Sequence, residues 1–407
     1  MKASVYTVIA VVINNLGSLG VNKLFAAWFG PQGIALLAHF QNLIALLTTV
    51  PNDGINRGIV KQLAGAGESR FSSTFYSSLI ITCIVYFGSI AFIIGFHTFF
   101  LDEIGLQPFS LLFFLIVLGI FFLVLSLFLS SIALGHNDAT YYNTFTILTG
   151  VFAFAFVFVG VLTEDMLQAF LLLVMAHGGV LIILVIWAYR KKYLPSFEFF
   201  KELEFKEYLK FSAMALAVLI FTRITDFYVR DFAIREYNLY ETGLWQAVVK
   251  ISNSYTTLFT SVAAVVFYPS MASLLHKKEE LAGYLRKVLL ILTPTLGGML
   301  LGVYLFRFFL MTILFEAGFK DAAYLFPYQL TGDLFKLLSW MLAYLMMLEG
   351  KVVLFILSEA ISAFLYIALV HMFNHEFKME VFTFAHMIRS IIYFIFIFLV
   401  YRKFLFK

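Results

Sequence analysis

The chain has 407 residues, of which 62% are hydrophobic and only 13% are charged, and its mean hydropathy is +0.94. A soluble protein of this length normally has about a quarter of its residues charged, which covers the surface of its domains with polar groups. Half that share leaves too little polar surface for a globule in water. The composition therefore excludes an ordinary soluble protein, and the net charge of +4 says little by itself.

Apolar segments of about 20 residues follow one another along the chain, and each is long enough to cross a hydrocarbon core of ~30 Å. They predict an all-α, polytopic membrane protein with twelve transmembrane helices. The predicted helices lie at residues 4–28, 33–56, 72–95, 109–134, 141–162, 166–189, 208–234, 243–268, 285–310, 325–349, 351–373 and 380–401.

The distribution of Lys and Arg predicts the orientation of these helices. If both termini are cytoplasmic, 18 of the 28 basic residues lie on the cytoplasmic side and only 3 in the opposite loops. Because cytoplasmic loops carry the excess of Lys and Arg, we predict an N-in, C-in topology.

A basic linker divides the chain into two sets of six helices. We predict an N-terminal lobe at residues 1–190, a cytoplasmic linker at 191–207 and a C-terminal lobe at 208–407. Lobes with an even number of helices enter the membrane from the same side, as in transporters built from parallel repeats. Pro51 and Gly54 interrupt the second helix and Pro269 ends the eighth, at corresponding places in the two lobes. These prolines mark either elements that line a site or tolerated helix ends.

The sequence "FTRITDFYVRD" (221–231) places charges inside the seventh helix. Each ionisable side chain at a helix centre costs about 2.5–3.5 kcal/mol on insertion scales. Arg223, Asp226 and Arg230 fall within about 60° of one another on an ideal helix, so they form a stripe. Three such charges would cost on the order of 8–10 kcal/mol in lipid. The stripe is therefore predicted to face away from the lipid.

Other intramembrane charges give two competing interpretations. They are Lys23, Asp53, Arg57, Lys250, Asp333, Lys336, Glu359 and Arg389. In the first interpretation they pair off and hold helices together, as Asp333 and Lys336 can at helical spacing. In the second, the excess of cations lines a water-filled cavity that attracts an anionic substrate. In that cavity arginine would hold phosphate bidentately and lysine as a point charge.

Motifs of catalysis and cofactor binding are absent from the sequence. Cys83 is the only cysteine, so neither a disulfide nor a thiolate metal cluster is predicted. No glycine-rich phosphate-binding loop occurs, which argues against ATP hydrolysis. We predict a protein that is not an enzyme and that has no cofactor, no metal site and no nucleic-acid partner.

Four stretches carry a resemblance to a known family. "KLFAAWFGPQGIALLAHFQNL" and "GINRGIVKQLA" resemble the start of Wzx-type polysaccharide flippases. "ETGLWQAVVKISNSYTTLFTSVAAVVFYPSMASL" and "FPYQLTGDLFKLLSWMLAYLMMLEGKVVLFILSE" are similar to the family of O-antigen translocases and lipid III flippases. This family belongs to the multidrug/oligosaccharidyl-lipid/polysaccharide (MOP) exporter superfamily, and the resemblance covers nearly the full chain.

The resemblance implies a protein of the bacterial inner membrane with two six-helix lobes around a central cavity. Through this cavity an undecaprenyl-pyrophosphate-linked oligosaccharide, such as an O-antigen or enterobacterial-common-antigen-like repeat unit, would pass from the cytoplasmic to the periplasmic leaflet. It also implies a glycan polymerase and a chain-length regulator as partners. Residues that match the family are Lys23, Lys61, Arg230, Trp245, Gln246, Pro269, Gln329, Asp333, Lys336 and Glu359. Arg223, Asp226 and Lys250 do not match, which leaves open which glycan is carried.

These observations predict a flippase that works by alternating access through a cationic cavity. The predicted substrate-binding residues are Lys23, Arg57, Lys61, Arg223, Arg230, Trp245, Gln246, Lys250, Lys336 and Arg389. Asp226, Asp333 and Glu359 are candidates either for charge pairs or for binding a coupling H⁺ or Na⁺. A cation-coupled multidrug exporter of the same superfamily is the alternative, but its cavity is expected to be acidic. A lipid-glycan polymerase or ligase would need a large periplasmic loop, and the outer loops here are short.

Overall fold

The computed structural model describes residues 2–56, 58–60, 63, 71–136, 138–195, 216, 219–263, 267, 270–271, 274–349 and 351–405. Within these ranges the chain is helical and contains no strand. It forms two compact units: Met1–Phe29 with Leu36–Phe227, and Gly30–Ala35 with Tyr228–Lys407. The lobe boundaries predicted at residues 190 and 208 stay a prediction, because most of the linker lies outside the described ranges.

The first helix, α1 (Lys2–Thr49), contains a break between two predicted helices. Gly30 has φ +62° and ψ −158°, in the left-handed half of backbone space that glycine adopts without a steric penalty. Pro31 follows it and lacks the N–H that a continuous helix needs. The chain then continues into a π-helical segment, η1 (Val50–Asn56). This segment contains Pro51 and Gly54, where the sequence predicts that the regular hydrogen-bond pattern is interrupted.

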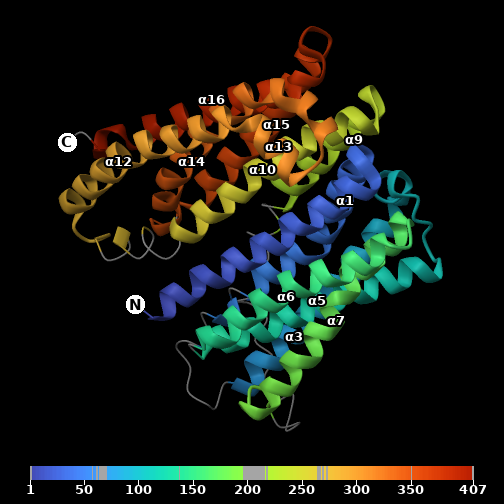
Figure 1. Ribbon diagram of the computed structural model, residues 1–407. Helices are drawn as coiled ribbons and strands as arrows, with labels where there is room; N and C mark the ends of the chain where they lie inside the picture. Colours follow the sequence, from blue (N-terminus) through green and yellow to red (C-terminus); the bar gives the residue numbers. More distant parts are fainter. Residues whose placement is uncertain are drawn as a thin grey trace. The chain divides into compact units, whose positions relative to one another are not determined.

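Five further α-helices follow among the described residues of the first unit before residue 196. They are α3 (Phe71–Gly95), α4 (His97–Phe100), α5 (Leu111–Gly135), α6 (Ala139–Val161) and α7 (Met166–Arg190), with a short turn η3 (Asp102–Ile104) between α4 and α5. Helix α7 packs along both α5 and α6, and these helices run beside α3 in Figure 1. Their shared core contains large buried side chains such as Phe128 and Tyr141. A π-helical segment η4 (Leu219–Ile224) leads into α9 (Thr225–Tyr237), where the first unit ends.

The second unit is built around α14 (Phe326–Leu348). This helix packs against α10 (Leu239–Val262), α12 (Lys278–Leu305), α15 (Val352–Phe377) and α16 (Val381–Leu405). Short helices α13 (Arg307–Leu314), η6 (Ala317–Leu325) and η7 (Lys378–Glu380) connect them. The orange and red ribbons of α14, α15 and α16 lie together in Figure 1. Two clusters of buried apolar residues surround α14, one of them including Leu285 of α12 and Tyr401 of α16.

Seven helical segments of the described residues are long and apolar enough to cross a membrane. Two of them, Ile9–Val60 and Val353–Leu405, have 52 and 53 residues. One crossing needs about 20 residues, so each of these segments accommodates two of the predicted helices. Large apolar side chains on other spans are exposed, for example Leu111 at 76% and Leu290 at 75%. The prediction of an all-α polytopic membrane protein is confirmed, whereas the number twelve and the N-in, C-in orientation stay predictions.

A polar cluster fixes the connection between α5 and α6 in the first unit. Asp138 caps α6 by accepting a hydrogen bond from the Tyr141 N–H at 3.1 Å. Its other oxygen accepts from the Tyr193 hydroxyl at 2.9 Å and lies 3.4 Å from the Lys191 ammonium. Burial raises the pKa of the Asp138 carboxyl, but these bonds and the Lys191 charge outweigh it and lower that pKa below 3.8. Burial and the neighbouring Asp138 raise the pKa of Tyr193 to about 12.

The substitution Asp138→Ala is predicted to lower the stability of the first unit by about 1–2 kcal/mol, because it removes a helix cap and the acceptor for Tyr193. Asp138→Asn should lose less, since asparagine still caps. Asp165→Ala, which removes only the exposed cap of α7, is the matched control. Unfolding in detergent measures these differences.

The pH dependence of this contribution follows from the lowered pKa. It should be fully present above the ordinary value of 3.8 and be lost as the pH falls through the lower folded value. A wild-type advantage over Asp138→Asn that grows on acidification would contradict the assignment.

Candidate functional site

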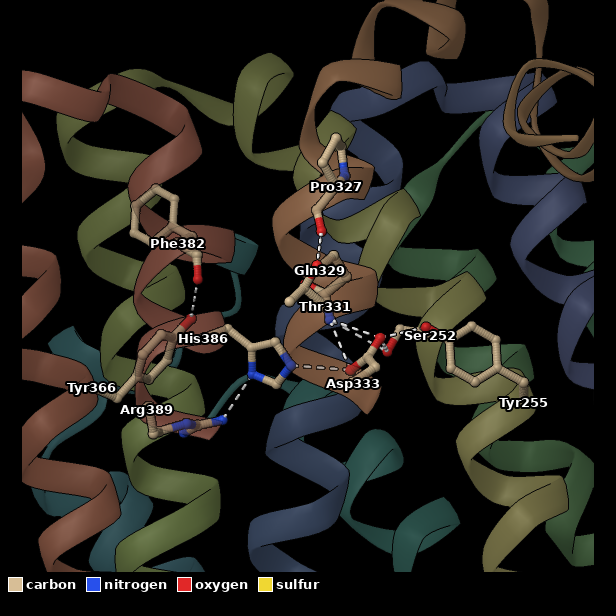
Figure 2. Close-up of polar contacts among 10 residues, drawn as sticks. All are labelled: Ser252, Tyr255, Pro327, Gln329, Thr331, Asp333, Tyr366, Phe382, His386 and Arg389. Atoms are coloured by element: carbon tan, nitrogen blue, oxygen red, sulfur yellow. Dashed lines mark hydrogen bonds and ion pairs between the residues drawn. The ribbon is translucent and has the colours of Figure 1, made fainter. Parts of the chain in front are cut away.

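The second unit encloses a buried carboxylate that four side chains contact. Asp333 of α14 has no exposed surface. Its Oδ2 accepts hydrogen bonds from the Tyr255 hydroxyl and from the Ser252 hydroxyl, the latter at 2.6 Å, both on α10. Its Oδ1 lies 3.0 Å from His386 Nε2 of α16. Figure 2 shows the carboxylate between these groups, with α10 on one side and α16 on the other.

Gln329 completes the contacts of this carboxylate from the same helix. It lies one helical turn before Asp333, so its side chain lies over the carboxylate. Its amide nitrogen donates to Oδ1 at 3.2 Å and to Oδ2 at 3.3 Å, and it also reaches the Ser252 hydroxyl at 3.3 Å. A buried carboxylate is costly unless hydrogen bonds replace its water, and these donors meet that need.

The hydrogen bonds around His386 determine its tautomer. Arg389 Nη2 lies 3.2 Å from His386 Nδ1. An arginine can only donate, so Nδ1 must accept and the proton of the neutral ring must lie on Nε2. The Nε2–H then donates to Asp333. The three side chains form a directed chain from the Arg389 guanidinium through the neutral imidazole to the carboxylate.

Arg389 is held on its other side by an aromatic ring. Its guanidinium carbon lies 4.3 Å from the centroid of the Tyr366 ring on α15, a distance at which cation–π attraction is substantial. The Tyr366 hydroxyl donates to the Phe382 carbonyl at 3.3 Å, which ties α15 to the beginning of α16. Both contacts are visible in Figure 2.

Gly332 allows α14 and α16 to approach closely enough for these bonds. A Cβ at this position would lie 2.6 Å from His386 Cδ2 and 3.0 Å from Met387 Cα. Either distance is shorter than a van der Waals contact. The absence of a side chain at Gly332 is therefore a geometric requirement for the bond between His386 and Asp333.

The predicted carboxylate Glu359 belongs to a separate contact between α15 and α16. It accepts a hydrogen bond from the Tyr393 hydroxyl at 2.8 Å. The same hydroxyl lies 3.5 Å from Ser358 Oγ. Glu359 is half-buried, in contrast to Asp333.

The structure buries two of the predicted cations in the second unit. Arg230 of α9 and Lys250 of α10 are each 7% exposed, and they lie close enough for their like charges to interact. Trp245 and Gln246, also predicted as substrate contacts, are buried one turn earlier on α10, and the Trp245 ring stacks on Phe382 with centroids 4.6 Å apart.

The remaining predicted residues are half-buried or lie outside the described ranges. Lys336 is half-buried on α14 and its ammonium lies 5.0 Å from the centroid of the Trp340 ring. Lys23, Arg223 and Asp226 are half-buried in the first unit. Arg57, Lys61 and Pro269, and the side chain of Asp53, lie outside the described residues. Asp226 and Arg230 lie one turn apart on α9, and Arg223 lies in η4 directly before it. The stripe stays a prediction.

Sequence reasoning did not single out His386, Tyr255, Ser252 or Tyr366. The one available signal was the spacing of His386 and Arg389, which puts both side chains on one face of a helix. A histidine one turn before an intramembrane arginine offers it an acceptor. In the part of the chain that the structure describes, no group of three or more His, Cys, Asp or Glu side chains forms a metal site.

The chain is similar in sequence to a family of polysaccharide biosynthesis proteins and to two lipid III flippases. Residues 1–275 match the family model described as polysaccharide biosynthesis protein. The lipid III flippases of Escherichia coli (strain K12) and Shigella flexneri are each 24% identical to it over 371 residues, which cover 88% of this chain and 87% of theirs.

Solved structures of MOP-superfamily transporters share its fold. A multidrug resistance MATE family transporter in an inward-facing conformation has a TM-score of 0.76 at 13% identity, with 98% of each chain covered. A MOP-superfamily transporter from Pyrococcus furiosus, described as having a binding pocket of reverse polarity that suggests a different function, has a TM-score of 0.69 at 13% identity, with 99% of this chain and 96% of that chain covered. These matches support the predicted fold of a multi-pass membrane protein.

The substitution Gly332→Ala is predicted to separate α14 from α16 and to lower the midpoint of thermal unfolding in detergent by several degrees, because overpacking costs about 1–3 kcal/mol. Gly298→Ala in α12 is the matched control, since a Cβ there meets nothing within 4 Å. That change should leave stability unchanged or slightly raise it. Equal effects of the two substitutions would show that the close approach at Gly332 is not needed.

Proposed function

We propose that this chain, which belongs to the polysaccharide biosynthesis protein family, is a flippase for an undecaprenyl-pyrophosphate-linked oligosaccharide. It moves the glycan from the cytoplasmic to the periplasmic leaflet. The family match over residues 1–275 and the similarity to two lipid III flippases support a lipid-linked glycan as the substrate. We propose an O-antigen or enterobacterial-common-antigen-like repeat unit as the glycan.

The observation that carries this proposal is the buried pair of like charges, Arg230 and Lys250. Two cations at 7% exposure are costly in a low-dielectric surrounding, and their mutual repulsion adds to that cost. A pyrophosphate that enters their surroundings is attracted by both positive charges. Arginine binds such a group through two parallel N–H donors, and lysine adds a compact positive charge.

The same pair argues against the multidrug exporter as the function. The fold is shared with MATE transporters, but at 13% identity the similarity carries no information on the substrate. A cationic drug would be repelled by Arg230 and Lys250. An anionic lipid-linked substrate is attracted by them.

Transport by this chain involves no covalent step. We propose that it proceeds by alternating access through a cationic cavity and that Lys23, Arg57, Lys61, Arg223, Lys336 and Arg389 add to the positive charge. The carboxylates Asp226, Asp333 and Glu359 are candidates for coupling to H⁺ or Na⁺. A glycan polymerase and a chain-length regulator are proposed as partners that act on the translocated product.

Reconstituted proteoliposomes test the proposed function, with lipid III and an O-antigen repeat unit on undecaprenyl pyrophosphate as probes. The wild-type chain is predicted to flip at least one of them. Arg230→Gln and Lys250→Gln should each lower the rate at least about tenfold, because each removes a charge-assisted bond worth about 1.5–3 kcal/mol. Arg235→Gln is the matched control, since the side chain of Arg235 is 59% exposed and pairs with Asp231.

Two results would contradict the proposal. Failure of the wild-type chain to move any of several undecaprenyl-pyrophosphate-linked glycans would show that the substrate class is wrong. Normal transport by both Arg230→Gln and Lys250→Gln would remove the role of the buried cations even if the substrate class is right.

A further inference from the structure

His386 occupies a position that the proposed transport function leaves unexplained. It is 6% exposed, and both ring nitrogens are engaged in hydrogen bonds of opposite direction. Nε2–H donates to Asp333 and Nδ1 accepts from Arg389. Figure 2 shows the imidazole between the carboxylate and the guanidinium, so it is the only link that joins them in the drawn network.

We propose that His386 is the group that takes up the coupling proton in the second unit, and that proton uptake at Nδ1 releases Arg389. This inference rests on the proposed function and extends it, because it names the proton as the coupling ion and a histidine rather than a carboxylate as its acceptor. The bond that forms is Nδ1–H, and the interaction that breaks is the hydrogen bond from Arg389 Nη2 to the Nδ1 lone pair.

The geometry favours His386 over Asp333 as the proton acceptor. Both carboxylate oxygens of Asp333 already accept hydrogen bonds, from Ser252 and Tyr255 on one oxygen and from His386 on the other, with Gln329 shared between them. A proton on this carboxylate would need one of the donors to withdraw. At His386, by contrast, the Nδ1 lone pair accepts one of these hydrogen bonds, the one from Arg389. The same donors leave the carboxylate poorly suited to Na⁺, which needs oxygen acceptors around it.

Protonation of His386 strengthens its interaction with Asp333 and weakens its interaction with Arg389. The charged ring keeps its bond to Asp333 and strengthens it, because the bond becomes charge-assisted at both ends. On the other side, an imidazolium N–H and a guanidinium N–H would face each other at the present 3.2 Å separation. Two donors of like charge cannot stay at that distance in a buried site, so Arg389 must move away from His386.

The released guanidinium becomes available to an anion. In the present state Arg389 lies between His386 and the Tyr366 ring, and it is half-buried. Once its acceptor is lost, the planar donor fork can bind a phosphate bidentately. Proton uptake and pyrophosphate binding would then favour each other through a single side chain.

The charged and titratable groups near His386 can be assigned to the helices that surround it. Asp333 and Lys336 of α14 and Arg389 of α16 act on it directly. Helix α15 contributes the neutral Tyr366 beneath Arg389 and Glu359, which is bonded to Tyr393 of α16. Lys378 and Glu380 of η7 precede the first turn of α16. The charged residues of α12 lie in its first turns, and that end packs near Tyr401, at the opposite end of α16 from His386.

The variant His386→Gln removes proton uptake but can keep the two hydrogen bonds of the side chain. Glutamine can donate from its amide nitrogen to Asp333 and accept at its amide oxygen from Arg389, so it copies the neutral imidazole. It cannot take up a proton at any working pH. His371→Gln is the matched control, because His371 is exposed and bonds to Tyr228 on the surface of the same unit.

Nitrogen NMR of the ¹⁵N-histidine and ¹⁵N-arginine labelled full chain tests the inference without any substrate. The His386 signal is the one that is missing from the spectrum of His386→Gln. In the wild type it can also be assigned by magnetisation transfer from the Arg389 guanidinium. We expect a neutral Nε2–H ring at high pH that becomes an imidazolium on acidification while the protein stays folded. The transfer from Arg389 should disappear over the same pH range.

The inference is overturned if His386 stays neutral at every pH at which the protein is folded, or if the neutral ring carries its proton on Nδ1. It is also overturned if the contact between His386 and Arg389 persists after protonation.

A transport measurement then connects the proton to flipping. In proteoliposomes with lipid III and an O-antigen repeat unit on undecaprenyl pyrophosphate as probes, the pH gradient has its acidic side where the glycan is loaded. This gradient should accelerate flipping by the wild type and by His371→Gln at least about fivefold and leave His386→Gln unaffected. A full gradient response in His386→Gln would overturn the inference. If the wild type flips none of several undecaprenyl-pyrophosphate-linked glycans, the proposed substrate fails, whereas the NMR titration still decides the role of His386.

Discussion

The carboxylate of Asp333 is the constraint on which the second unit depends. A fully buried negative charge inside a membrane protein is tolerated only if nearby donors replace its water. Hydrogen-bond donors from α10, α14 and α16 converge on the Asp333 carboxylate. The need for these donors holds the three helices together around it. Gly332 follows from the same constraint, because only a residue without a side chain lets His386 reach the carboxylate.

The charges of the second unit fall into two groups with different physical roles. Asp333 and Glu359 accept hydrogen bonds from side chains of their own unit, which agrees with the interpretation that intramembrane charges hold helices together. Arg230 and Lys250 are buried as like charges, which agrees with the interpretation that cations attract an anionic substrate. The proposed function assigns the first interpretation to the carboxylates and the second to these two cations. Arg389 connects them, since it is a cation held by the network of Asp333 and can be released from it.

The sequence was sufficient for the fold class and for most helix positions, because long apolar segments must be helical in a membrane. Pro51 and Gly54 likewise indicated the irregular backbone of η1. The site was harder to predict. Asp333 and Arg389 were recognisable because each is a charge in an apolar helix. Ser252, Tyr255 and His386 carry no such signal, since polar but uncharged residues are common in helices. Their role depends on how α10 and α16 pack against α14, and sequence spacing within one helix does not contain that information.

Infrared spectroscopy of the folded protein tests the central claim, that Asp333 is an ionised carboxylate held by its donors. The difference spectrum between the wild type and Asp333→Asn at neutral pH isolates the vibrations of this one group. The account predicts the loss of a carboxylate stretch, and predicts that this stretch persists on mild acidification because His386 takes the proton instead. If the difference spectrum at neutral pH instead shows the loss of a protonated carboxyl stretch in Asp333→Asn, the account is contradicted, because Asp333 then holds the proton itself.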